Sequence, residues 1–127
     1  MPTPLYRLTV TADFSAAHQL RHYQGKCERM HGHNFGVEAV VEGQALTPDT
    51  ELLMDFKELK RLLNQVLEKL DHRLLNEVDC FAERNPSSEN LARHVYTELA
   101  PKLPEGVRLV EVSVSEKGSS KATYLEV

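Results

Sequence analysis

Cysteine is scarce in this sequence. Its 127 residues contain two cysteines, Cys27 and Cys80, which are too few for the disulfide framework that stabilises many small secreted domains. In a reducing compartment we expect such thiols to be free, bound to a metal or catalytic. Cys80 is assigned no role, since simple packing also explains an isolated thiol.

Long apolar segments and an excess of basic residues are also missing. Apolar stretches span only a few residues, and the start, MPTPLYRLTVTADF, has no basic region followed by a continuous apolar segment. We therefore expect neither a membrane-spanning helix nor a signal peptide. The formal net charge of -4 leaves no basic footprint for a nucleic acid. These features predict a cytoplasmic protein with no nucleic-acid or membrane partner.

The composition that remains is ordinary for a globular protein, with 41% hydrophobic and 27% charged residues. A chain of this length buries about two thirds of its unfolded surface as one domain and is too short for two. We expect a single domain that covers residues 1–127.

Apolar and polar residues alternate in two N-terminal segments. The first runs from Tyr6 to His18 and the second from His33 to Val41. A period of two predicts strands with one buried face each. His18 ends the first apolar row, and His31 and His33 open the second.

The middle of the chain has a helical period. Between Glu51 and Leu70 leucines and other apolar residues recur every three or four positions, which predicts an amphipathic helix of up to about five turns. A second helix is expected to start at Ser87 or Ser88 as its N-cap and to end before Pro101.

The C-terminal part alternates again. Val110, Val112 and Val114 share one phase with Glu116, and a Gly-Ser turn leads to a last strand around Ala122 to Val127. The order of elements predicts an α+β domain with a four-stranded antiparallel sheet and both helices on one face. Neither edge strand carries protective lysine runs or prolines, so we expect the sheet to continue through identical subunits of a homo-oligomer.

The histidines at the strand ends can bind a metal. His31 and His33 point the same way from one strand, and His18 ends a neighbouring strand of the same face. Three imidazoles with one open position are typical of catalytic zinc. Cys27, four residues before His31, either closes a structural, non-catalytic zinc module or stands beside an open metal site as a reactive thiol. One thiolate with three histidines is not a common structural set, which favours the open site.

Three acidic or imidazole side chains stand apart from the histidine set. Asp71 and His72 follow the first predicted helix and are either a surface cap or a pair in which the carboxylate orients an imidazole that exchanges protons with a thiol. Glu116 lies in an inward phase, where a carboxylate needs a partner such as the guanidine-like edge of a ligand. The alternative is that the strand ends there and Glu116 turns to solvent.

Several short segments resemble one known family. In chain order they are FSAAH (Phe14 to His18), CERMHGHNF (Cys27 to Phe35), MDF (Met54 to Phe56), LDHRLLN (Leu70 to Asn76), NPSSENLA (Asn85 to Ala92) and SEK (Ser115 to Lys117). Together they resemble the 6-pyruvoyltetrahydropterin synthase family, most closely its bacterial 6-carboxytetrahydropterin synthase branch, which serves queuosine biosynthesis. Ser87 replaces a commoner threonine and keeps the hydroxyl.

The resemblance implies a role for each of these residues. The zinc ligands correspond to His18, His31 and His33, the catalytic base to Cys27, the proton-relay pair to Asp71 and His72, and the anchor of the pterin guanidine edge to Glu116. It also implies the tunnelling fold, in which subunits join their sheets into a barrel, commonly as a hexamer of two trimers. Active sites then lie between subunits, so the relay pair is expected to approach Cys27 from a neighbouring chain.

The spacing of the motif implies a reaction. Three residues separate Cys27 from His31, which resembles the branch that converts 7,8-dihydroneopterin triphosphate into 6-carboxy-5,6,7,8-tetrahydropterin, acetaldehyde and triphosphate. The alternative within the family is a 6-pyruvoyltetrahydropterin synthase, which releases no acetaldehyde. Glu28 stands where a folate-pathway branch has its glutamate base. It is either a second base, for aldol cleavage of dihydroneopterin, or a solvated loop carboxylate.

Overall fold

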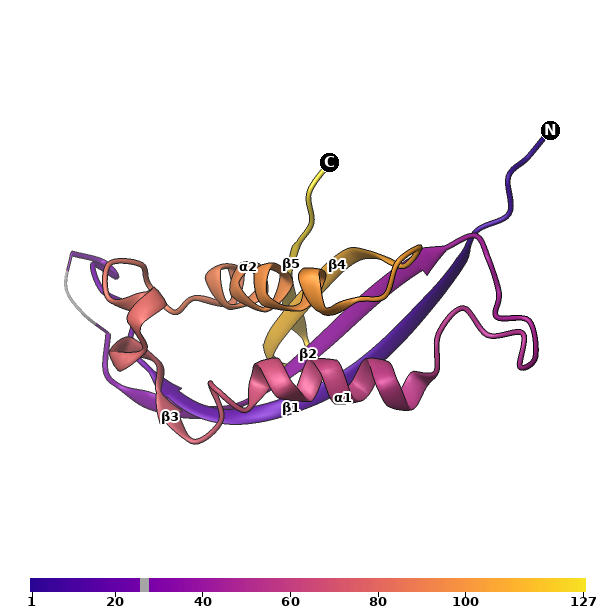
Figure 1. Cartoon of the computed structure of the whole chain (residues 1–127). Coiled ribbons are helices and arrows are strands. Elements are labelled where there is room, and N and C mark those ends of the chain that lie inside the picture. Colours follow the sequence, from indigo (N-terminus) through magenta and orange to yellow (C-terminus); the bar gives the residue numbers. More distant parts are fainter. Residues whose placement is uncertain (26–27) are drawn as a thin grey trace.

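Two long antiparallel strands form the centre of the sheet. The computed structural model describes residues 1–25 and 28–127, and in it β1 (Tyr6–His18) pairs with β2 (His31–Gly43) along their whole lengths. β4 (Arg108–Lys117) pairs antiparallel with β2, and β5 (Ser120–Tyr124) with β4 (Figure 1). The α+β prediction is confirmed, and the first strand has the predicted bounds.

Among the described residues the sheet has five strands, in the order β3-β1-β2-β4-β5, one more than the four predicted. The additional strand β3 (Arg73–Leu74) runs parallel to β1 and pairs with Ala16 and Ala17. Two residues are too few to show an alternation in the sequence, which is why the pattern did not reveal this strand. In the part of the chain that the structure describes, the rest of the outer edge of β1 has no paired strand.

The first helix is shorter than predicted, whereas the second has nearly its predicted span. α1 (Phe56–Leu67) starts after the N-cap Asp55, whose carboxylate accepts a hydrogen bond from the Lys57 backbone N–H. Residues 51–55 and 68–70, which were predicted to be helical, therefore lie outside α1. α2 (Ser88–Leu99) has Ser87 as its N-cap, as predicted. Short 3₁₀ turns cover Leu75–Glu77, Asp79–Phe81 and Ala100–Lys102. Among the described residues no helix is both long and apolar enough to cross a membrane.

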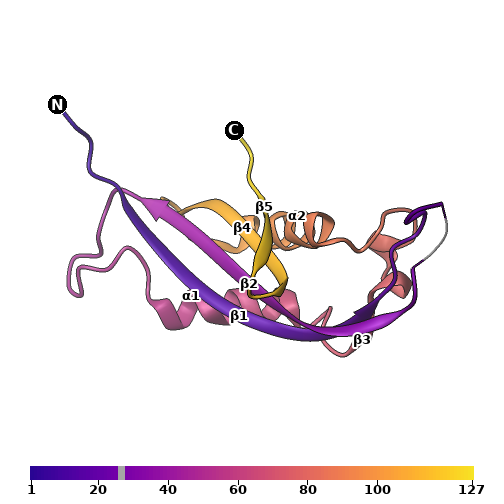
Figure 2. The same ribbon diagram turned by 180° about the vertical axis from the view of Figure 1, so that it is seen from behind.

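Both helices pack on one face of the sheet and enclose a single apolar core. Leu59 and Leu63 of α1 and Leu91 and Val95 of α2 are fully buried against the apolar row of the strands, which includes Phe35. Figure 1 shows the two helices on the same side, and in the reverse view of Figure 2 the strands lie in front of α1. The opposite, polar face of the sheet carries exposed residues such as Thr9, Thr11 and Asp13. Burial of the apolar row therefore determines which face each strand presents to the helices.

An ion-pair network joins three strands at the end of the sheet opposite the histidines. The Glu42 carboxylate accepts hydrogen bonds from Arg108 Nη2 at 2.6 Å and Arg7 Nε at 3.0 Å. The hydrogen bond from Arg108 and then that from Arg7 hold the pKa of Glu42 below its usual value. Glu42 is therefore ionised at neutral pH, and the network stabilises one register of β1, β2 and β4.

The chain packs tightly around Gly43, at the end of β2. A Cβ at this position would lie 2.5 Å from the Gly106 carbonyl oxygen and 2.6 Å from Leu53 Cδ1. The backbone atom cannot rotate away, so we expect Gly43→Ala to lower the free energy of unfolding by about 1–3 kcal/mol. Gly118→Ala is the matched control, because a Cβ at Gly118 meets nothing within 4 Å. Equal urea-unfolding midpoints for the two variants would contradict this account.

Candidate metal centre

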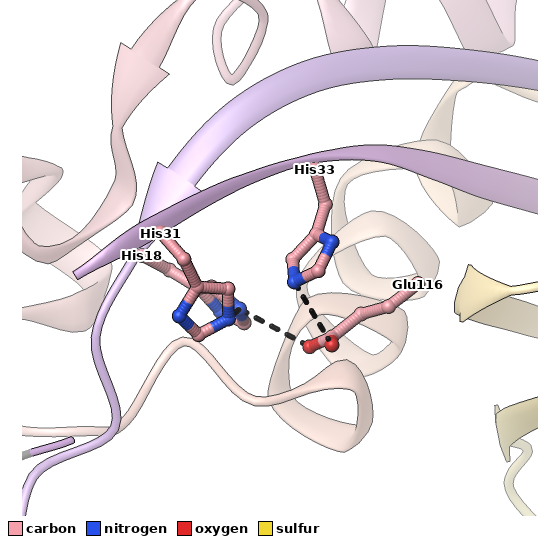
Figure 3. Close-up of side chains that lie close together, drawn as sticks. All are labelled: His18, His31, His33 and Glu116. Carbon is pink, nitrogen blue, oxygen red and sulfur yellow. Dashed lines mark hydrogen bonds and ion pairs between the residues drawn. The ribbon is translucent and has the colours of Figure 1, made fainter. Parts of the chain in front are cut away.

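The register of the central strands brings the histidines together. His18 is the last residue of β1 and lies directly opposite His31, the first residue of β2. His33 follows two positions later, so its side chain points to the same face as that of His31. Glu116 reaches the same place from β4, and Figure 3 shows its carboxylate directed at the imidazoles. The structure thus brings together the predicted metal ligands and Glu116.

The four side chains offer closely spaced ligand atoms. One atom from each of His18, His31, His33 and Glu116 lies within 4.8 Å of all the others. The His18 Nε2 atom is 3.1 Å from His31 Nε2. The two Glu116 oxygens are 3.1 Å from His18 Nε2 and 3.3 Å from His33 Nε2. Glu116 therefore does not turn away to solvent, although its side chain is 30% exposed.

Backbone carbonyls orient two of the imidazoles. His18 is fully buried, and its Nδ1 lies 2.7 Å from the Pro86 carbonyl oxygen. His31 Nδ1 lies 2.9 Å from the Arg29 carbonyl oxygen. A carbonyl only accepts, so each Nδ1 carries a hydrogen, which leaves each Nε2 as the nitrogen that can bind a metal. This is the outer hydrogen bond that holds metal-binding histidines in proteins.

The donor set fits a divalent cation. Lone pairs of imidazole nitrogens and carboxylate oxygens that face one another repel, and a cation between them removes the repulsion. Zinc bonds of about 2.0–2.1 Å in a tetrahedron separate neighbouring ligand atoms by about 3.3 Å. The three imidazoles and the carboxylate lie close to that spacing, with separations of 3.1 Å from His18 Nε2 to His31 Nε2, 3.1 Å from His18 Nε2 to Glu116 Oε1 and 3.3 Å from His33 Nε2 to Glu116 Oε2. The donor types and their spacing therefore fit a zinc ion.

Two asparagines hold the loop that leaves His18. Asn76 Oδ1 accepts from the Gln19 N–H and its Nδ2 donates to the Gln19 carbonyl, at 2.9 and 2.8 Å. Asn85 makes the same pair of bonds to the backbone of Arg21, at 2.7 and 2.9 Å. Each side-chain amide thus accepts from the N–H and donates to the carbonyl of one loop residue, as a neighbouring strand does in a β-sheet. Sequence patterns did not identify either residue as part of the site, because this pairing depends on chain segments far apart in the sequence.

Glu28 is held within the same loop. Its Oε1 accepts from the Leu20 N–H at 3.0 Å and lies 3.9 Å from His31 Nδ1, and its side chain is 21% exposed. Of the two alternatives for Glu28, the fully solvated carboxylate does not describe this position. Cys27, the predicted base, lies outside the described residues.

Asp71 and His72 lie at the edge where β3 meets β1. Asp71 Oδ1 accepts from the Ser15 N–H at 2.9 Å, and His72 Nδ1 is 3.0 Å from Asp71 Oδ2. The hydrogen bond from Ser15, more than that from His72, holds the pKa of Asp71 below its usual value. α1 ends at Leu67, so the pair follows the helix by several residues.

Of the predicted relay pair, His72 is the member that faces open space. The His72 side chain is 80% exposed and borders a cavity of about 610 Å³ that is also lined by Ser15, His33 and Asn34. Asp71 is ionised at neutral pH and orients an imidazole that is free to meet another group.

A second cavity adjoins Glu116. It measures about 410 Å³, and Glu89 at the start of α2 lines it together with Glu116, Ser88 and Lys117. Sequence patterns did not single out Glu89 as a residue of the site. Two carboxylates on one cavity provide acceptors for a ligand that presents several N–H groups.

The chain is similar to a family of pterin enzymes. Residues 7–127 match the family described as 6-pyruvoyl tetrahydropterin synthase. A 6-carboxy-5,6,7,8-tetrahydropterin synthase of Synechocystis sp. is 38% identical over 115 residues, which cover 87% of this chain and 86% of that protein. A dihydroneopterin monophosphate aldolase of Pyrococcus furiosus is 36% identical over 110 residues, or 87% and 89% of the two chains.

Solved structures share the fold. The 6-pyruvoyl tetrahydropterin synthase of Caenorhabditis elegans superposes with a TM-score of 0.82 at 24% identity, over 100% of this chain and 99% of that chain. A Plasmodium vivax 6-pyruvoyltetrahydropterin synthase with a substituted catalytic glutamate gives 0.78 at 21% identity, over 97% and 98%. The likeness confirms the tunnelling fold. With the match over residues 7–127, it follows that the chain belongs to the 6-pyruvoyl tetrahydropterin synthase family.

Proposed function

We propose that this protein is a zinc-dependent lyase of queuosine biosynthesis. It converts 7,8-dihydroneopterin triphosphate and water into 6-carboxy-5,6,7,8-tetrahydropterin, acetaldehyde and triphosphate. The observation that carries the proposal is the convergence of His18, His31 and His33 in a chain 38% identical to a 6-carboxy-5,6,7,8-tetrahydropterin synthase. We further propose that it acts in the cytoplasm as a single domain of residues 1–127.

The histidine set prepares the site for its chemistry. Bound zinc polarises the side-chain hydroxyls of the substrate and acidifies the adjacent C–H bonds. His18 and His31 are held in one tautomer by the carbonyls of Pro86 and Arg29, so their lone pairs need no reorganisation. Cys27 removes a substrate proton as the thiolate, a form that a nearby cation favours.

Asp71 and His72 transfer protons during loss of triphosphate. Asp71 holds the imidazole through Nδ1 at 3.0 Å, which leaves Nε2 to exchange a proton with Cys27 or the substrate. The pair borders a cavity at the sheet edge, and the outer edge of β1 next to it is largely unpaired among the described strands. We propose that a neighbouring chain of a homohexamer, a dimer of trimers, completes the site there.

Glu116 and Glu89 receive the ring of the substrate. A pterin presents a planar guanidine-like edge with several N–H donors, and a carboxylate accepts two of them in parallel. Both carboxylates line the same cavity of about 410 Å³ next to the histidines. A ring held there places its side chain at the metal ligands.

A second candidate reaction is aldol cleavage of dihydroneopterin, with Glu28 as the base. It is supported by the position of the Glu28 carboxylate, 3.9 Å from His31 Nδ1, and by 36% identity to a dihydroneopterin monophosphate aldolase. A 6-pyruvoyltetrahydropterin synthase activity is the remaining alternative, supported by relatives such as the Drosophila melanogaster enzyme at 32% identity. The three reactions yield different products.

Product analysis tests the lyase. Zinc-loaded protein given 7,8-dihydroneopterin triphosphate is expected to yield 6-carboxytetrahydropterin and acetaldehyde, measured by mass spectrometry and an aldehyde assay. Loss of the base in Cys27→Ala should lower turnover roughly 10²- to 10⁴-fold, whereas Cys80→Ala, which removes the other thiol, should not. Pyruvoyltetrahydropterin without acetaldehyde would favour the alternative synthase, and no turnover by folded, zinc-replete protein would contradict the lyase.

Glu28→Gln tests the second reaction. The amide oxygen of glutamine still accepts the Leu20 N–H, so the loop is kept while the base is lost. We expect formation of 6-hydroxymethyldihydropterin from dihydroneopterin to fall at least about 10²-fold. In Cys27→Ala the same cleavage should persist. Undiminished cleavage by Glu28→Gln, or none by the unchanged protein, would exclude Glu28 as an aldol base.

A further inference from the structure

Glu116 lies between the histidine cluster and the cavity that it shares with Glu89. Its oxygens lie 3.1 and 3.3 Å from the Nε2 atoms of His18 and His33. The same residue also lines the cavity of about 410 Å³ that it shares with Glu89. Both carboxylate oxygens are directed at the histidine nitrogens, so the carboxylate has to turn before it can accept two parallel hydrogen bonds from a ring edge in that cavity.

The geometry favours coordination when the cavity is empty. Each Glu116 oxygen faces an imidazole nitrogen, Oε1 at 3.1 Å from His18 Nε2 and Oε2 at 3.3 Å from His33 Nε2. One ligand atom from each of the four side chains lies within 4.8 Å of all the others. The carboxylate is therefore close enough to be a fourth ligand of a metal held by the three histidines.

A closed set of four protein ligands is typical of structural zinc, whereas catalytic zinc keeps one position open. The fourth ligand must then be able to leave. The Glu116 side chain is 30% exposed, whereas His18 is fully buried. A partly exposed carboxylate can move at far lower cost than the buried imidazole.

The backbone at Glu116 also permits movement. The pairing of β4 with β2 ends at Ser115, and its register with β5 shifts between Val114 and Lys117. Glu116 thus lies in an irregular part of the ladder, where strands bend and side chains are re-aimed. The imidazoles of His18 and His31, in contrast, are held by carbonyl partners.

We propose that Glu116 is an exchangeable fourth ligand of the metal. In the substrate-free protein its carboxylate closes the coordination sphere. When a pterin enters the neighbouring cavity, the guanidine-like edge of the ring draws the carboxylate away and opens a coordination position for the substrate side chain. This second step rests on the proposed function. Metal coordination by Glu116 in the empty site does not.

Zinc binding without substrate tests the first step. We expect Glu116→Gln to bind zinc roughly tenfold or more weakly than the unchanged protein in competition with a chromophoric chelator. Glu89→Gln is the matched control, because it neutralises the other carboxylate of the same cavity and should leave zinc affinity within about twofold. The visible spectrum of the cobalt-loaded protein should change in Glu116→Gln alone. Thermal unfolding of the metal-free forms shows whether each variant is folded.

Addition of pterin, which lacks side-chain hydroxyls, tests the exchange. The cobalt spectrum of the unchanged protein should shift towards that of Glu116→Gln, while the spectrum of Glu116→Gln itself stays the same. Equal zinc affinities and cobalt spectra for the unchanged protein and a folded Glu116→Gln would overturn coordination by Glu116. A cobalt spectrum insensitive to pterin would overturn the exchange. Absence of turnover counts against the lyase alone, because the zinc measurements need no substrate.

Discussion

The pairing of β1 with β2 is the constraint on which the rest of the structure depends. It aligns His18 with His31 and places His33 on the same face. A slip of one residue would move every side chain of a strand to the opposite face and would separate the imidazoles. The apolar row that contains Phe14 and Phe35 prevents such a slip, because the same alternation that buries the core also directs the histidines.

The core therefore supports the metal centre directly. His18 ends an apolar row and is itself fully buried, at a point where the loop before α2 supplies the Pro86 carbonyl. Asn76 and Asn85 come from the segment between the helices and hold the backbone of the following loop. Parts of the chain more than fifty residues apart thus determine the position of one imidazole, which is typical of sites built on a rigid scaffold.

The candidate site residues differ in how firmly their side chains are held. Glu116 lies in the irregular part of β4, and His72 is largely exposed beside a cavity at the sheet edge. Asp71 is anchored to the Ser15 backbone, whereas the buried His18 imidazole is held by the Pro86 carbonyl. Under the proposed function, the firmly held imidazoles would bind the metal, and the more exposed carboxylate and imidazole would adjust to the substrate.

Much of this was predictable from local patterns. Alternation located β1 and the start of the histidine row, and Ser87 was identified as an N-cap because capping depends on neighbours in the sequence. The sequence pattern determined only part of the placement of Glu116. Its inward phase required a partner, but only the approach of β4 to β2 brought that carboxylate to the histidines.

The sequence by itself determined the fold class, the two helices and the histidines on one face, since each follows from a period of residues along the chain. Tertiary structure alone decided the short parallel strand β3, the asparagine pairing to Gln19 and Arg21, and the separate cavities beside Glu116 and His72. These features arise from contacts between distant segments. No local pattern records such contacts, because they exist only once the sheet and helices have packed together.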